Sequence, residues 1–436
     1  MTKEDRLKNL YVKRDVSWMY FNHRILQEAK KEYVPLLERL SFLGIYSNNL
    51  DEFFRVRVAS LNRILASDDV DKRTKQDVKR TIKTINLLNE SYSKEYTEAT
   101  RQVFRELELH KVRMVNETQL NDEQKKWLEN FYYDKLNGST NPIWLSEIKD
   151  LSTLEDNRIY LIVEKTIIKD ARSKYAIIKV PDKTFGRFIK IPASDGYDNI
   201  MYLDDVIRFC LPFIFIGLRP SYFRAYSFKF TKDAEMEVDN DADYGTMERI
   251  AIGVDSRKRG EPIRVLYDRD MPQSMQKKIL ERLDIRELDT SLASGRYQNH
   301  KDLMKFPDCG HDELKYPKWK HLMKPEFLSE QSILDLIREK DRFIHVPYHS
   351  FDAYIRVLRE AALKPEVKEI KTTLYRLAKD SKVVKALICA ARNGKKVTAV
   401  VELLARFDEE SNIKWSKRMQ EEGVNVIFGV EGLKIH

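Results

Sequence analysis

Apolar side chains recur at three-and-four spacing through most of the first hundred residues. In residues 34–66 they alternate with charged positions, which predicts helix, and the polar triplet Ser47, Asn48 and Asn49 marks a place where the helix could be interrupted. Residues 72–108 repeat the pattern. We therefore expect an N-terminal helical bundle.

The pattern changes from about residue 109 onward. Short runs rich in β-branched residues, at 158–163, 175–180 and 263–267, are separated by turn residues and by helical stretches. This mixture is typical of an α+β domain. The acidic run 233–243 is predicted to be a solvated loop or the start of a helix.

The last part of the chain alternates strand-like and helix-like segments. Asp380 and Ser381 are candidates to cap the first helix, and Ser411 and Asn412 to cap the second. The predicted order is strand, helix, strand, helix, strand, over residues 369–377, 382–392, 396–404, 411–422 and 424–428. Such a unit forms a parallel sheet, and ligands gather at the carboxyl ends of its strands.

These patterns predict a multidomain α+β fold. The predicted domains are a helical bundle at 1–108, a mixed α+β domain at 109–319, and an α/β domain at 320–436, with Pro307, Pro317 and Pro325 near the second boundary.

Composition narrows the classes of protein without naming one. The 436 residues carry a net charge of +9, with 42% hydrophobic and 34% charged residues, which excludes a wholly disordered chain. Three scattered cysteines predict reduced thiols and no disulfide framework. The longest apolar run, 209–218, is too short to span a membrane. We expect a soluble, cytoplasmic protein, with no stripe of basic and aromatic residues for nucleic acid.

Three side chains are predicted at or beyond the carboxyl ends of the C-terminal strands: Arg376, Arg406 and His436. Two guanidinium groups suit a multiply charged phosphate chain, because each binds phosphate oxygens through two donors. A neutral imidazole can attack phosphorus and form a phosphohistidine. This combination suggests phosphoryl transfer.

Simpler interpretations stand beside this one. Both arginines could be ordinary surface residues, and Asp408, Glu409 and Glu410 are better explained as the acidic first turn of a helix than as a metal site. A zinc site at residues 345–349 is disfavoured by the proline between its two histidines. Neither the phosphate-binding GxxxxGK[ST] loop nor the dinucleotide motif GxGxxG occurs.

Several longer motifs resemble those of the bacterial polyphosphate kinase family, and they extend over nearly the whole chain. They are DVSWMYFNHRILQEA (15–29), LERLSFLGIYSNNLDEFFRVRV (37–58), RDMP (269–272), SGRYQNHKDL (294–303), PYHSF (347–351), IKTTLYRLAKDS (370–381), NGKKVTAVVELLARFDEE (393–410) and GLKIH (432–436).

The resemblance implies an enzyme that reversibly transfers the terminal phosphoryl group of ATP to inorganic polyphosphate through a phosphohistidine. It implies a helical N-terminal domain, a head domain and a phospholipase-D-like domain. It assigns the phosphohistidine to His436, a nucleotide contact to Asn49, and the phosphate and magnesium site to Arg376 and Arg406. Because arginine is a poor metal ligand, we interpret the arginines as phosphate-site neighbours of Mg²⁺.

The resemblance also implies partners and an assembly. These are ATP or ADP, polyphosphate, and further copies of the chain in a homodimer or homotetramer; some relatives associate peripherally with the inner face of the membrane. In the family the motif at His436 continues into a second phospholipase-D-like domain, so we expect a longer enzyme of which this is part. The alternatives are a phospholipase-D-like phosphodiesterase and a non-catalytic protein that binds polyphosphate or ATP.

Overall fold

The computed structural model divides into two compact units. The described residues of unit 1 lie within 11–232 and 262–317, and those of unit 2 lie within 318–435. The structure describes residues 11–151, 154–169, 171–193, 195–219, 221–232, 262–283, 290–403, 405, 408–429 and 433–435. The predicted acidic loop at 233–243 lies outside these residues.

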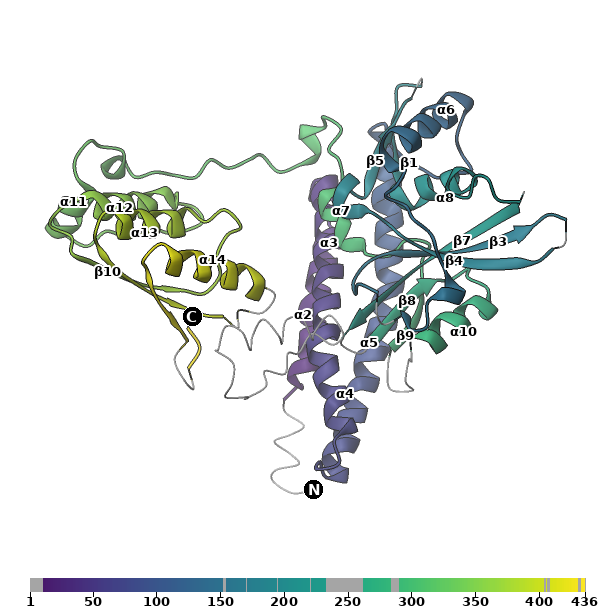
Figure 1. Cartoon of the computed structure of the whole chain (residues 1–436), viewed down its shortest axis with the longest axis horizontal. Coiled ribbons are helices and arrows are strands. Elements are labelled where there is room, and N and C mark those ends of the chain that lie inside the picture. The colour runs from purple at the N-terminus through teal and green to yellow at the C-terminus, as the bar shows by residue number, and fades with distance from the viewer. Residues whose placement is uncertain are drawn as a thin grey trace. The chain divides into compact units, whose positions relative to one another are not determined.

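Unit 1 begins with the predicted helical bundle. Its helices are α2 (Arg14–Ala29), α3 (Leu36–Phe53), α4 (Ala59–Ala66) and α5 (Lys72–Leu109). Figure 1 shows α2, α3 and α5 packed side by side. Leu40, Leu43 and Ile85 are completely buried between them, and each such side chain contributes about 1.5–3 kcal/mol by leaving water. The helical prediction for this region is confirmed.

The predicted interruption near Ser47 and Asn49 is wrong. Helix α3 runs through these positions, and the irregular segment is the π-helical turn Phe54–Val58 that follows it. The polar side chain at 49 has a partner on another helix, since Asn49 Nδ2 donates to Asn22 Oδ1 at 3.3 Å. Because the Asn49 amide bonds to another helix, it does not compete for the backbone hydrogen bonds of α3.

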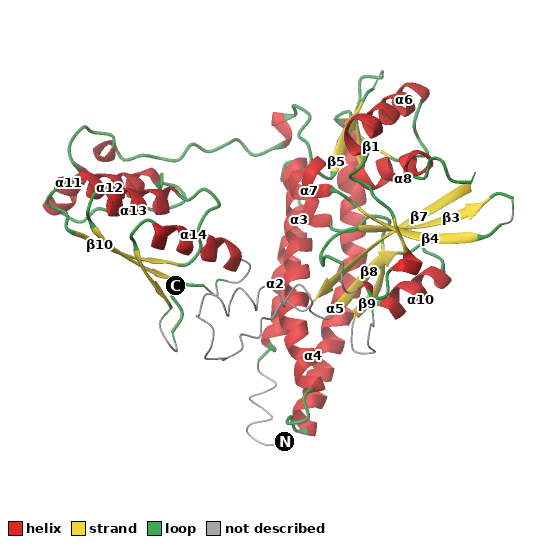
Figure 2. Ribbon diagram, in the orientation of Figure 1, coloured by secondary structure: helices red, strands yellow, loops and turns green. Residues whose placement is uncertain are grey.

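The described part of unit 1 also contains two sheets, whose strands are yellow in Figure 2. The first has the order β1-β6-β5 and the second has the order β2-β4-β3-β7-β8-β9. All neighbours are antiparallel except the parallel pairs β1–β6 and β8–β9. The strands are β1 (Val112–Val115), β2 (Ile143–Trp144), β3 (Tyr160–Ile167), β4 (Ser173–Lys179), β5 (Phe188–Ile191), β6 (Asp198–Tyr202), β7 (Ser221–Lys232), β8 (Pro262–Asp268) and β9 (Thr290–Ser294). The helices are α6 (Asp122–Phe131), α7 (Asp182–Phe185), α8 (Leu203–Ile214) and α10 (Gln273–Arg282).

Strand β3 separates two cores because successive side chains point to opposite faces. Leu161 and Val163 belong to the core that includes α8, whereas Tyr160 and Ile162 belong to the core that includes α10. The β-branched runs at 158–163, 175–180 and 263–267 correspond to β3, β4 and β8. The mixed α+β prediction is therefore confirmed.

Unit 2 is built on the predicted parallel sheet, in the order β10-β11-β12. Its strands are β10 (Glu369–Leu374), β11 (Lys396–Val401) and β12 (Asn425–Phe428), and its helices are α11 (Ile333–Glu339), α12 (Asp352–Leu363), α13 (Lys382–Arg392) and α14 (Glu409–Glu421). Side chains of α12, α13 and α14 share one core with the sheet.

The predicted cap of the first connecting helix is confirmed. Ser381 Oγ accepts from the backbone N–H of Val384 at 3.3 Å. The cap predicted at Ser411 and Asn412 is wrong, because α14 begins at Glu409 with Asp408 at its N-cap position. The acidic residues Glu409 and Glu410 form the first turn, where the helix dipole favours negative charge.

Two further expectations concern the whole chain. Within the described ranges, no helix combines the length and the apolar character that a membrane span needs. The thiols of Cys210, Cys309 and Cys389 are free, as predicted.

Candidate active site

The sheet of unit 2 presents the ends of its three strands in register. Leu374, the last residue of β10, pairs with Val401 of β11, and Val401 pairs with Phe428 of β12. The segments that follow these residues therefore leave the sheet at one edge, which we call the carboxyl edge. Ligands of parallel α/β sheets bind at this edge.

Arg376 lies at the carboxyl edge, two residues beyond β10. Its Nε is 3.0 Å from Oδ2 of Asp408, which precedes α14. The side chains of Arg376 and Asp408 are 56% and 37% exposed, so the ion pair adds little stability. The carboxylate instead restrains the guanidinium while leaving much of it accessible to an anion.

Asn412 connects the ends of two strands to α14. It is completely buried, and its Nδ2 donates to the backbone oxygen of Tyr375 at 2.9 Å and to that of Glu402 at 2.8 Å. Tyr375 follows β10 and Glu402 follows β11. The amide predicted to cap a helix thus fixes the backbone immediately before Arg376.

The described residues 433–435 also reach the carboxyl edge. The backbone N–H of Ile435 donates to Glu402 Oε2 at 3.0 Å, and Glu402 is only 7% exposed. The Lys434 ammonium lies 5.7 Å from the centre of the Tyr375 ring, and the Arg376 guanidinium lies 5.5 Å from it. Two cations therefore share one aromatic ring at this edge.

Two of the four predicted site residues, Arg406 and His436, lie outside the described residues. Their neighbours Ala405 and Ile435 are described and buried. The roles predicted for Arg406 and His436 stay predictions.

Asn49, the predicted nucleotide contact, belongs to unit 1. Its amide donates to Asn22 on α2, and Asn22 in turn donates to the backbone oxygen of Tyr46 at 3.2 Å. The side chain of Asn49 is partly exposed. These hydrogen bonds hold the Asn49 side chain in a defined orientation between α3 and α2. Its role as a nucleotide contact stays a prediction.

Two residues further along α3, Asp51 forms a buried ionic group with residues of β7 and β8. Asp51 is 3.0 Å from the Arg264 guanidinium and also accepts from Lys229. Burial opposes ionisation of Asp51, but Lys229 and Arg264 outweigh it and lower the pKa of the carboxyl. Sequence reasoning missed this group because its members are far apart in the chain.

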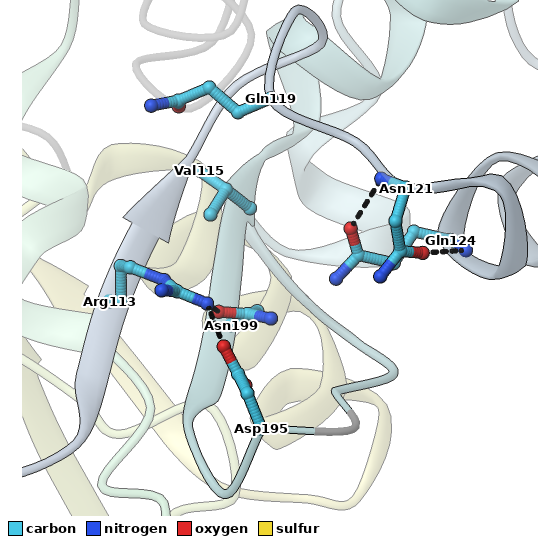
Figure 3. A pocket seen from close by; sticks show the side chains of 7 residues that line it. All are labelled: Arg113, Val115, Gln119, Asn121, Gln124, Asp195 and Asn199. Atoms are coloured by element: carbon cyan, nitrogen blue, oxygen red, sulfur yellow. Dashed lines mark hydrogen bonds and ion pairs between the residues drawn. The ribbon is translucent and has the colours of Figure 1, made fainter.

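A small polar hollow of about 210 Å³ lies beside β1 and β6 (Figure 3). Most of its polar side chains form hydrogen bonds with one another. Arg113 donates to Asp195 at 2.7 Å and to Asn199 at 2.9 Å, and Asn121 and Gln124 form a reciprocal helix cap. We assign no ligand to it.

The chain matches three domain models of one family. The polyphosphate kinase N-terminal domain matches residues 11–115, the middle domain matches residues 123–306, and C-terminal domain 1 matches residues 332–436. The chain belongs to the polyphosphate kinase family. The third match contains the whole carboxyl edge.

Individual relatives agree with this assignment. The chain is 39% identical to polyphosphate kinase of Vibrio vulnificus strain YJ016 over 98% of its length, and 38% identical to that of Escherichia coli strain K12, also over 98%. These alignments cover 61% and 63% of the two relatives. The chain thus spans somewhat less than two thirds of the polyphosphate kinases it matches.

A solved polyphosphate kinase has the same fold. The crystal structure of the Porphyromonas gingivalis enzyme matches with a TM-score of 0.76 at 30% identity, over 97% of this chain and 60% of that one. This match supports the multidomain α+β architecture.

Proposed function

We propose that this chain acts within a polyphosphate kinase, an enzyme that reversibly transfers the terminal phosphoryl group of ATP to inorganic polyphosphate. The observation that carries the proposal is the carboxyl edge of unit 2, within the matched C-terminal domain 1. There, Asp408 pairs with Arg376, and Asn412 holds the backbone just before Arg376 by donating to the Tyr375 oxygen; we call this contact the Asn412 brace. The backbone N–H of Ile435, the residue before His436, donates a hydrogen bond to Glu402.

In this proposal His436 is the nucleophile. An imidazole nitrogen forms a bond to the terminal phosphorus of ATP, the bond to the bridging oxygen breaks, and ADP leaves with the electron pair. In the second step a terminal oxygen of polyphosphate attacks the same phosphorus and the P–N bond breaks. The reverse sequence makes ATP from polyphosphate and ADP.

Arg376 and Arg406 are the proposed phosphate ligands. Guanidinium groups stay protonated and offset the charge that gathers on the phosphoryl oxygens during transfer. The side chain of Arg376 is 56% exposed, so a phosphate can reach its guanidinium. Asn49 is the proposed contact for the nucleotide.

Mg²⁺ is the proposed cofactor. Among the described residues there is no group of three His, Cys, Asp or Glu side chains that could hold a metal by itself. This fits an ion bound mostly by substrate phosphates, with Asp408 as a candidate carboxylate ligand at the carboxyl edge. When bound, Mg²⁺ would screen phosphate charge.

The two alternatives are not favoured by the family membership. A phosphodiesterase would release an alcohol or nucleotide from a diester without ATP, and a binding protein would transfer nothing. We further propose assembly as a homodimer or homotetramer, and a cytoplasmic location with or without peripheral attachment to the inner face of the membrane.

The test is chemical labelling of the full-length protein. Incubation with ATP carrying label in the terminal phosphate should give acid-labile label on the protein, and His436→Ala should remove it. His110→Ala is the control, because His110 is an exposed residue at the end of α5 in unit 1. Label that survives His436→Ala would refute the assigned nucleophile, and absence of label from the parent protein would refute the phosphohistidine.

A further inference from the structure

Unit 1 contains a large cleft that the proposed reaction does not use. It has a volume of about 870 Å³ and lies between α3, α5, β8 and β9. Figure 1 labels these four elements. Binding clefts for small molecules fall in the range of about 300–1,000 Å³. We call it the aromatic cleft and define it by Tyr46, Tyr96, Tyr202, Arg269, Tyr297 and His300.

The walls are unusually rich in rings. Tyr46 and Tyr96 are stacked with centres 5.4 Å apart, and His300 lies 5.4 Å from Tyr96. Tyr202 and Tyr297 form a second stack at 3.9 Å. Flat aromatic side chains present surfaces that favour offset or edge contacts with another planar ring.

Among the described residues, one cationic side chain of the cleft has no acidic partner. Lys94 pairs with Glu90 at 3.1 Å, Arg101 pairs with Glu98, and Arg264 pairs with Asp51. The exposed Arg269 guanidinium has neither a hydrogen bond nor an ion pair with any described residue. A single free guanidinium matches a ligand with one anionic group better than a polyphosphate.

His300 adds no positive charge to the cleft. Burial, together with the nearby cations Arg187 and Lys229, lowers the pKa of His300 to about 4. Its imidazole is therefore neutral at physiological pH and offers a polar edge to a ligand.

Two buried polar atoms in the walls also lack partners. Tyr46 is 3% exposed and Arg264 is 4% exposed, yet the Tyr46 hydroxyl and Arg264 Nε have no hydrogen-bond partner among the described residues. Buried polar groups are nearly always satisfied, and such exceptions often mark a missing partner.

We propose that the aromatic cleft binds a small planar aromatic molecule carrying one negative charge, of which an aromatic carboxylate is the simplest kind. The rings hold the planar part and Arg269 holds the anion. Arg269 and the residues 294–300 come from the motifs RDMP and SGRYQNHKDL, to which the proposed phosphoryl transfer assigns no role. The inference stands whether or not the chain transfers phosphate.

The test is calorimetric titration of the full chain with 2-naphthoate. We expect saturable binding of one molecule per chain with a sub-millimolar Kd. The neutral 2-naphthamide should bind roughly tenfold more weakly, because it lacks the charge-assisted bond to Arg269. Inorganic phosphate should show no saturable binding at this site. Equal binding of 2-naphthoate and phosphate would mean a simple anion patch and would overturn the proposal.

Variants localise the binding. Arg269→Gln should weaken 2-naphthoate binding roughly tenfold, whereas Arg105→Gln, an exposed arginine of α5 outside the cleft, should not. Gly295→Trp should abolish binding, since a Cβ at Gly295 meets no atom within 4 Å and the indole would occupy the cleft.

Two controls keep the result interpretable. Thermal unfolding must show that Gly295→Trp and Arg269→Gln remain folded, and Arg376→Gln should bind 2-naphthoate normally because Arg376 belongs to unit 2. Retention of binding in folded Gly295→Trp, or no saturable binding to the parent chain, would refute the aromatic cleft as a ligand site.

Discussion

At the scale of single residues, the ion pair between Arg376 and Asp408 matters for the position of the guanidinium more than for the stability of the fold. Both side chains are substantially exposed, so the pair contributes little to folding. Its effect is to restrict the guanidinium to one region of the carboxyl edge. A restrained cation loses less freedom when it binds phosphate.

The first prediction follows from this restraint. In the full-length protein, Arg376→Gln should lower the rate of polyphosphate synthesis by about 10²-fold, because the donor proposed for the transferred phosphoryl group is lost. Arg392→Gln is the matched control, since Arg392 is an exposed arginine of the same unit, paired with Glu422 at 2.6 Å. Synthesis assays with ATP measure both. Equal rates in the two variants would exclude a role for Arg376 in transfer.

The second prediction concerns the buried group around Asp51. Asp51→Asn should lower the free energy of unfolding by about 3–5 kcal/mol, because Lys229 and Arg264 are then left without a counter-charge. The exposed neighbour substitution Glu52→Gln should have almost no effect. Urea unfolding at neutral pH distinguishes the two.

The same group predicts a pH dependence. The pKa of Asp51 is lower in the folded state than in the unfolded chain, so its contribution is complete above the unfolded pKa and disappears as pH falls through the folded value. The difference in unfolding free energy between the parent and Asp51→Asn should therefore shrink below about pH 4. A difference that stays constant down to pH 2, or grows, would contradict the assignment.

At the scale of secondary-structure elements, sequence periodicity predicted the helical bundle and all three strands of unit 2. It succeeded where the determinants are local, as at the Ser381 cap. The prediction failed where a side chain bonds to a partner that is distant in the sequence. Asn49 does not break α3 because Asn22 accepts its hydrogen bond, and Asn412 is a brace because the ends of β10 and β11 lie beside it.

The carboxyl edge was only partly predictable for the same reason. The position of Arg376 after a parallel strand could be inferred from the alternation of elements. Its pairing with Asp408 and the bond from Ile435 to Glu402 depend on how separate loops meet. No local pattern encodes the Asp51 group, whose members are contributed by α3, β7 and β8.

The third prediction tests the brace. Asn412→Ala should destabilise unit 2 by about 2 kcal/mol, because two backbone carbonyls lose their donor. Ser411→Ala should change stability by less than about 0.5 kcal/mol, since Ser411 lies inside α14 and caps nothing. Chemical unfolding followed by circular dichroism measures both. Similar losses would restore the capping interpretation that the structure rejects.

At the scale of the whole molecule, the division into two units has an energetic meaning. The buried clusters of unit 1 share no residue with those of unit 2, of which the larger includes α12, α13, α14 and the sheet. Units with separate cores can unfold separately, in which case one free energy does not describe the chain.

The fourth prediction is therefore calorimetric. Heating the chain should give two overlapping transitions, with Asn412→Ala lowering the temperature of one and Asp51→Asn lowering the temperature of the other. Shifts of several degrees are expected for losses of this size. A single transition that both substitutions shift equally would show that the two units unfold together.

The bond between Ile435 and Glu402 bears on how freely this segment can change over evolutionary time. The donor is a backbone N–H, so position 435 can accept almost any side chain of suitable size without losing the bond to the carboxylate. Proline is the exception, because it has no N–H to donate. Tolerance of many residues at 435 combined with exclusion of proline would thus be the mutational signature of an anchor made by the main chain.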